Sequence, residues 1–87
     1  MMTLGIIVFN HDEQEWRLWI GHDSYWLQQG YSFELLLQNQ YFHAFLEKDM
    51  MDWFVTLEDE VKFVLHIHEV YKVGVRLEDY MKVTDQF

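Results

Sequence analysis

Short segments of β-branched and aromatic residues recur along the whole chain, separated by polar turns at roughly ten-residue intervals. The segment EWRLWIG, for example, places Trp16 and Leu18 on one face of a strand and Arg17 and Trp19 on the other. No apolar pattern with a period of 3.6 extends over the length of a helix, and proline is absent. The pattern therefore predicts a mostly β fold of short antiparallel strands.

Six or seven strands are expected in a small antiparallel barrel or sandwich, similar in size to an SH3 domain. They cover residues 3–10, 15–21, 32–38, 41–48, 53–57, 61–67 and 72–77, while residues 22–30 form a brief strand or a loop. Asn39 and Gln40 suit a two-residue hairpin turn, because Asn tolerates a left-handed backbone. Gly74 suits a bulge in the last strand.

Residues 31–57 depart from simple alternation, because both faces of these strands are apolar. A curled barrel would cover part of the second face with loops and chain ends. The rest is expected to be covered by a partner protein or by a second copy of the chain, since exposed two-sided strands mark interfaces or edge pairing.

The 87 residues are expected to form one domain, 1–87, since two cores would each bury too little surface. The tail, 78–87, is expected to fray, to dock as a short C-terminal helix, or to fold with a partner. Without cysteine the chain has neither disulfides nor thiol catalysis, which fits a cytoplasmic location. The apolar stretch 4–9 is too short for a signal peptide or a membrane span, so no membrane association is expected.

Fifteen acidic residues against six basic ones give a formal net charge of −9, which argues against direct nucleic-acid binding. The acidic residues gather at expected turns: Asp12, Glu13 and Glu15; Asp49 and Asp52; Glu58, Asp59 and Glu60; Glu78 and Asp79. Polar turns and solubility are the simple explanation. The sharper hypothesis is that turns carrying clusters such as Glu58, Asp59 and Glu60 converge into a negative surface, which imitates nucleic acid and binds a basic protein.

Most aromatic side chains are expected in the core, with Trp19 and Trp26 as exceptions. Trp19 shares its strand face with Arg17, and Trp26 lies in the segment with the least regular pattern. Exposed tryptophan is typical of protein-binding surfaces. The two residues are therefore candidate interaction residues, while stacking on a small ligand stays open as an alternative.

The histidines offer weaker signals. His66 and His68 would share a strand face at the spacing of two metal ligands, but a zinc site needs a third ligand. Each HD pair, at residues 11–12 and 22–23, puts a carboxylate next to an imidazole, and Ser24 follows the second. Adjacent turn residues rarely face each other, and the spacing fits no nucleophile template. No enzymatic activity, cofactor or metal is expected.

The segments GIIVF, GYSFELLL, YFHAFLE, DWFVTL and KVGVRL occur in an order that resembles a family of short uncharacterised proteins, a domain of unknown function from Gram-positive bacteria, their phages and mobile elements. The resemblance covers most of residues 5–77. It implies a compact β domain encoded near mobile elements and supplies no catalytic residue. Tyr71 and Lys72 stand where the family pattern has a Gly-Leu pair, and the acidic tail is additional.

Three functions follow from these features. The first is an acidic protein-interaction domain, such as a phage or mobile-element inhibitor that binds the basic surface of a nucleic-acid-binding protein. The second is a small ligand-binding or enzymatic β-barrel with a pocket at its mouth. The third is a structural homodimer whose edge strands pair.

Overall fold

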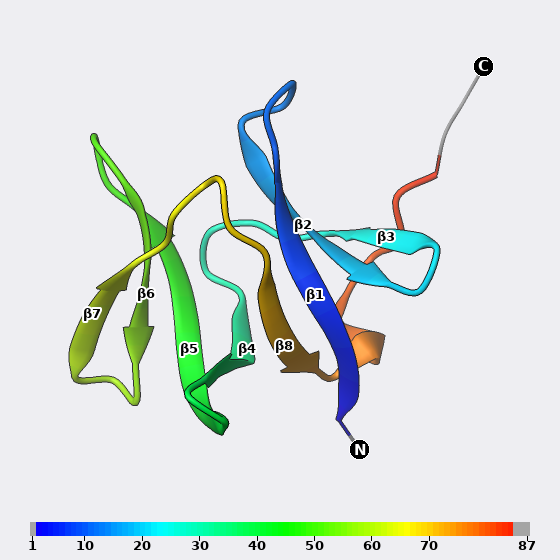
Figure 1. Ribbon diagram of the computed structural model, residues 1–87. Helices are drawn as coiled ribbons and strands as arrows, with labels where there is room; N and C mark the ends of the chain where they lie inside the picture. Colours follow the sequence, from blue (N-terminus) through cyan, green and yellow to red (C-terminus); the bar gives the residue numbers. More distant parts are fainter. Residues whose placement is uncertain (1, 85–87) are drawn as a thin grey trace.

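The structure is a computed structural model that describes residues 2–84 (Figure 1). It has eight strands and one short 3₁₀ turn. The strands are β1 (Thr3–Asn10), β2 (Glu15–Ile20), β3 (Asp23–Trp26), β4 (Ser32–Leu37), β5 (Gln40–Lys48), β6 (Trp53–Leu57), β7 (Val61–Val64) and β8 (Tyr71–Val75), and the 3₁₀ turn is η1 (Leu77–Asp79). Within residues 2–84, the expected C-terminal helix is limited to this 3₁₀ turn.

All eight strands form one antiparallel sheet in the order β3-β2-β1-β8-β4-β5-β6-β7. Its two halves meet where β8 pairs with β4 through only two residue pairs, Glu34 with Gly74 and Leu35 with Val73. This narrow junction lets the sheet curl, so that the inner faces of the two halves approach each other. The aromatic rings of Phe63 on β7 and Tyr71 on β8 are 6.3 Å apart, although three strands separate β7 from β8 in the sheet.

The sheet does not close, so the expectation of a barrel was not exact: a single open sheet curls around the core. The strand count was also too low, because Asp23–Trp26 is a true strand at one edge. Closure would require β3 to pair with β7, and these strands lie at opposite edges. The mostly β, antiparallel character is confirmed.

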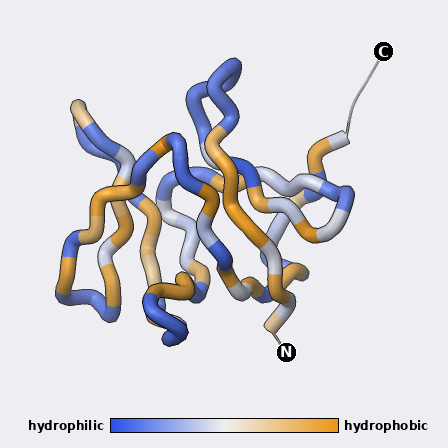
Figure 2. Tube along the Cα trace, in the orientation of Figure 1, coloured by the Kyte–Doolittle hydropathy of each residue, from blue (hydrophilic) through white to orange (hydrophobic). Residues whose placement is uncertain are grey.

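The hydrophobic core lies between the two curled halves. It consists of side chains that alternate along the strands: Ile7, Phe9, Trp16, Leu18, Leu27, Phe33, Leu35, Ala44, Leu46, Trp53, Val55, Leu57, Leu65, Tyr71, Val73 and Val75. Figure 2 shows the matching pattern along the chain, with hydrophobic strand centres and a hydrophilic β1–β2 turn. The tip of the β5–β6 turn is an exception, because Met50 and Met51 lie there.

The β4–β5 turn lies one residue earlier than expected. Gln38 and Asn39, with φ of 51° and 65°, are the two turn residues, and Leu37 pairs with Gln40. Two left-handed residues match the twist of the flanking strands. Asn39 therefore occupies the second turn position rather than the first, because the register that buries Leu35 and Ala44 sets where the strands end.

Two expectations about the last strands also need correction. β7 ends at Val64, and residues 65–70 form an irregular connection instead of continuing the strand to residue 67. Gly74 is no bulge, since it pairs in register with both Leu4 and Glu34. The side chain of Met2 lies where a Cβ atom of Gly74 would be.

The segment after β8 lies against β3. Tyr80 donates its hydroxyl proton to the carbonyl oxygen of Ser32 at 3.1 Å, and burial raises the pKa of Tyr80. Trp26 N–H then donates to Met81 O at 2.9 Å, and Val83 N–H donates to Ser24 O at 2.8 Å. This stretch of the tail thus covers the outer edge of β3, while residues 85–87 of the tail lie outside the described residues.

Candidate functional site

Trp19 and Trp26 lie on the same outer face of the sheet. Trp26 is the cross-strand partner of Arg17, which is two residues before Trp19 on β2. The guanidinium of Arg17 lies 4.3 Å from the ring centre of Trp26 and forms an ion pair with Glu13. Arg17 is only 7% exposed, so the stacked pair fixes this part of the face.

Apolar residues of β1 extend this surface. Trp19 pairs with Ile6, and the alternation along β1 places Leu4 and Val8 on the same face as Ile6. Leu4 is 61% exposed and Trp19 is 37% exposed, while Ile6 and Val8 are half-buried. We refer to Leu4, Ile6, Val8, Trp19 and Trp26 as the tryptophan face.

The acidic cluster Glu58–Glu60 lies far from the tryptophan face. It forms the turn between β6 and β7, at the opposite edge of the sheet from β2 and β3. Successive hairpin turns also alternate between the two ends of the strands, and Figure 1 shows the β1–β2 and β5–β6 turns at the top and the β6–β7 turn at the bottom. The acidic turns therefore do not converge on one end.

Glu58 has a structural role. Its carboxylate accepts a hydrogen bond from the backbone N–H of His43 at 2.6 Å, and its own N–H donates to His43 O at 2.8 Å. Its φ of 52° and that of Asp59, 59°, make this a turn with two left-handed residues. All three predicted acidic interaction residues are exposed. Within the described residues, Asp59 and Glu60 differ from Glu58 because their carboxylates accept no hydrogen bond from the backbone.

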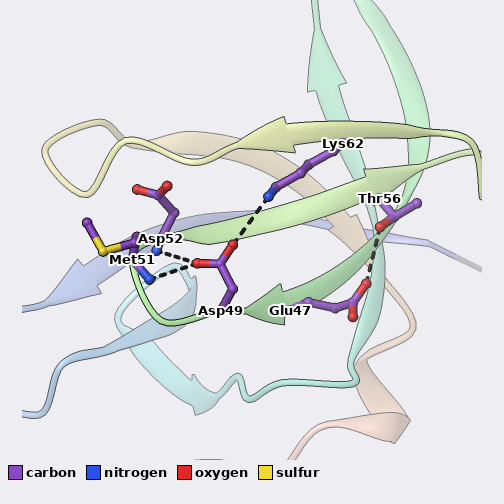
Figure 3. A network of polar contacts seen from close by, with 6 residues as sticks. All are labelled: Glu47, Asp49, Met51, Asp52, Thr56 and Lys62. Carbon is purple, nitrogen blue, oxygen red and sulfur yellow. Dashed lines mark hydrogen bonds and ion pairs between the residues drawn. The ribbon is translucent and has the colours of Figure 1, made fainter.

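The β5–β6 turn carries a polar network (Figure 3). One carboxylate oxygen of Asp49 accepts the backbone N–H groups of Met51 and Asp52, both at 2.8 Å, and the other accepts Lys62 Nζ at 3.2 Å. On the neighbouring strand Thr56 Oγ1 donates to Glu47 at 3.2 Å. These contacts lower the pKa of Asp49 below its ordinary value of 3.8. The hydrogen bond from Asp52 N–H has the largest effect, followed by that from Met51 N–H and by the contact with Lys62.

Replacing Asp49 with Asn should destabilise the protein in a pH-dependent way. Because the folded pKa of Asp49 is depressed, its stabilising effect is complete above 3.8 and disappears as the pH falls through the folded value. In urea melts, the difference between wild type and Asp49→Asn should be constant from neutral pH to about pH 5 and should narrow below pH 4. The exposed residue Asp59 provides the control, Asp59→Asn. A difference that grows as the pH falls would contradict this account.

The same turn exposes two methionines that sequence reasoning did not single out. Met50 is 99% exposed and Met51 is 86% exposed. They border a groove of about 550 Å³ that also contacts Trp53, Val64 and Ile67. Asp49 closes the turn that carries both methionines through its hydrogen bonds to the backbone N–H groups of Met51 and Asp52. Two adjacent methionines in an expected turn were the sequence feature that could have indicated this surface, although the sequence alone does not show that they are exposed.

The histidines do not assemble into a metal site. His66 and His68 are exposed in the β7–β8 connection rather than on a strand, and the ring of His68 stacks on that of His11 at 5.6 Å. Among residues 2–84 no three His, Asp or Glu side chains are grouped in a way that could hold a metal ion. Asp23 of the second HD pair contacts Lys82 of the tail at 3.1 Å.

A second hollow, of about 430 Å³, lies over β4, β5 and β8 and was not foreseen from the sequence. His43 Nδ1 lies 3.3 Å from a carboxylate oxygen of Glu34 at its wall, with Arg76 nearby. Both side chains of this pair are well exposed, so the interaction is weak. Ser32 also lines the hollow, but no hydrogen bond joins its hydroxyl to His43 within the described residues.

Comparison with known proteins assigns the family. A family model described as a domain of unknown function, DUF5348, matches residues 5–75. The chain belongs to the DUF5348 family. The match runs from β1 to the last residue of β8, so the segment that covers β3 lies outside the DUF5348 match. No curated protein and no solved structure matches the chain.

Membership in DUF5348 confirms the expected relationship to an uncharacterised domain family and brings no activity with it. No helix in the described residues is long and apolar enough to span a membrane.

Proposed function

We propose that this DUF5348 domain is a protein-interaction domain that binds its partner through the tryptophan face. The observation that carries the proposal is that Trp19 and Leu4 project outward from a sheet whose other face forms the core. Strand pairing on both sides of β1 and β2, together with the buried Arg17, holds these side chains in place. A rigid, partly exposed tryptophan loses little entropy on binding and is a frequent source of interface energy.

The partner is a protein with a basic surface. Glu15 lies on the same strand face as Trp19, and Asp12 is exposed in the turn that joins β1 to β2. These carboxylates place negative charge beside the apolar patch, and the net charge of −9 steers basic proteins toward the domain. Nucleic-acid-binding proteins carry such surfaces, and an inhibitor encoded by a phage or mobile element would act in this way.

Replacing Trp19 with Ser should weaken capture of a basic protein by at least tenfold, because removing a central interface tryptophan costs about 2 kcal/mol or more. Asp12→Asn combined with Glu15→Gln should weaken capture at about 50 mM salt, and the difference from wild type should narrow at about 500 mM, because salt screens the charges that the wild type retains. The measurement is quantitative capture of proteins from a bacterial lysate by the tagged wild type and by each variant.

Asp59→Asn with Asp52→Asn is the matched control, because it removes the same charge from the turns that join β5 to β6 and β6 to β7, in the other half of the sheet. A basic protein that binds the wild type and this control, and is lost with Trp19→Ser, supports the proposal. Equal loss with both charge variants would show that net charge alone recruits the partner. Capture that survives Trp19→Ser would place the binding surface elsewhere.

A further inference from the structure

The edge of the sheet formed by β7 is bare. Leu65 N–H donates to Trp53 O at 2.9 Å, so these two residues form a hydrogen-bonded pair. From this pair onward, hydrogen-bonded and non-hydrogen-bonded pairs alternate along β6 and β7. Val55 with Phe63 is the next hydrogen-bonded pair, which leaves the backbone N–H and C=O groups of Lys62 and Val64 directed away from β6. The opposite edge, β3, is covered by residues 81–83, so β7 is the open edge in the described part of the chain.

The usual protection of an edge strand is weak here. A lysine on an edge deters strand pairing when its charge projects outward. Lys62 instead reaches back over β6, where Nζ lies 4.4 Å from the ring centre of Phe54 and 3.2 Å from Asp49. Val61 and Val64 are exposed beside it, and the groove lined by Met50 and Met51 continues from Val64.

The two ends of β7 carry different side chains. The acidic turn Glu58–Glu60 precedes the strand, and His66 and His68 follow it beside Lys48 in the lining of the groove. An antiparallel copy of the same strand would bring its acidic end to the histidine end of the first. The edge is therefore complementary to itself, which is the requirement for a twofold-symmetric interface.

We propose that two copies of this chain pair through β7 in an antiparallel register centred on Phe63. In this register Lys62 lies opposite Val64 of the partner subunit, so that the free backbone groups of both strands are satisfied on each side of the axis. Val61 faces Leu65 of the partner subunit at the wall of the groove, and Glu60 faces His66 of the partner subunit. The dimer joins two eight-stranded sheets into one and leaves both tryptophan faces free.

The first test is the oligomeric state of the purified wild type by sedimentation as a function of concentration. A dimer that dissociates on dilution is expected, and a strictly monomeric wild type up to about 1 mM would overturn the proposal. Val64→Pro should abolish the dimer, because it removes an outward N–H and adds a ring at the edge, where proline is tolerated by the fold. Val64→Thr keeps the N–H and is the control. If Val64→Pro fails to fold, the oligomeric state of the wild type still tests the proposal.

The register is tested by a cross-link and a charge exchange. The chain has no cysteine, so Phe63→Cys introduces a single thiol on the proposed axis, where facing residues in a non-hydrogen-bonded pair are close enough for a disulfide. Mild oxidation should yield a covalent dimer of Phe63→Cys and none of Val70→Cys, an exposed control in the β7–β8 connection. Equal cross-linking of both variants would refute this register.

The charge exchange measures the pair of Glu60 with His66 of the partner subunit. His66→Lys should tighten the dimer by about fivefold, since it places a full positive charge opposite Glu60 at two positions related by symmetry. Glu60→Lys should weaken the dimer, and Glu60→Lys with His66→Glu should restore it. Failure of the restoration would contradict the pairing. A wild type that stays monomeric but binds a basic partner would leave the proposed function intact, so the two proposals fail separately.

Discussion

Replacing Trp16 with Ala is expected to remove much of the stability of the fold. Trp16 is 0% exposed and packs edge-on against Phe9 at 5.4 Å and tilted against Tyr71 at 5.9 Å. Truncating a buried tryptophan to alanine costs about 3–5 kcal/mol, because packing contacts are lost and a cavity remains. Small domains have a total stability of about 5–15 kcal/mol, so this one change removes much of it.

Trp19→Ala is a matched control for this prediction, because the same residue type is removed from the same strand but from its outer face. We expect it to change the free energy of unfolding by less than about 1 kcal/mol, as is usual for surface substitutions. Urea melts followed by circular dichroism measure both variants. Similar costs for Trp16→Ala and Trp19→Ala would mean that the assignment of inner and outer faces is wrong.

Adding one methyl group at Gly5 is expected to be much more costly than adding one at Gly74. A Cβ atom on Gly5 would lie 2.5 Å from the backbone oxygen of Trp19 and 2.4 Å from Ile20 Cδ1. The oxygen belongs to the paired strand β2 and cannot move without disturbing the β1–β2 ladder. Overpacking of this kind costs about 1–3 kcal/mol.

At Gly74 the close atoms are all from the side chain of Met2, with the sulfur at 2.4 Å. Methionine is unbranched and flexible, so its side chain turns aside at low cost. Replacing a strand glycine with alanine also reduces the entropy of the unfolded chain. Gly74→Ala should therefore be within about 1 kcal/mol of wild type, while Gly5→Ala shows a clearly lower urea midpoint. Reversal of this order would contradict the packing described around β1 and β8.

The sequence predicted the outward position of Trp19 but not the structural role of Glu58. The position of Trp19 opposite the core-facing residues of β2 follows directly from period-2 alternation, and the structure places it outward with Trp26 beside it. Charge alone groups Glu58 with Asp59 and Glu60 in the sequence. The hydrogen bond between Glu58 and His43 joins residues fifteen positions apart and so has no local signal.

The sequence by itself determined the mostly β class and the location of most strands, because alternation and turn residues act over a few neighbouring positions. It also indicated an uncharacterised domain family, and the DUF5348 model matches residues 5–75. The open sheet, the covered β3 edge and the bare β7 edge were decided only by the tertiary structure. These features depend on pairings such as Leu35 with Val73 and on the contact of Val83 with Ser24, whose partners lie far apart in the chain.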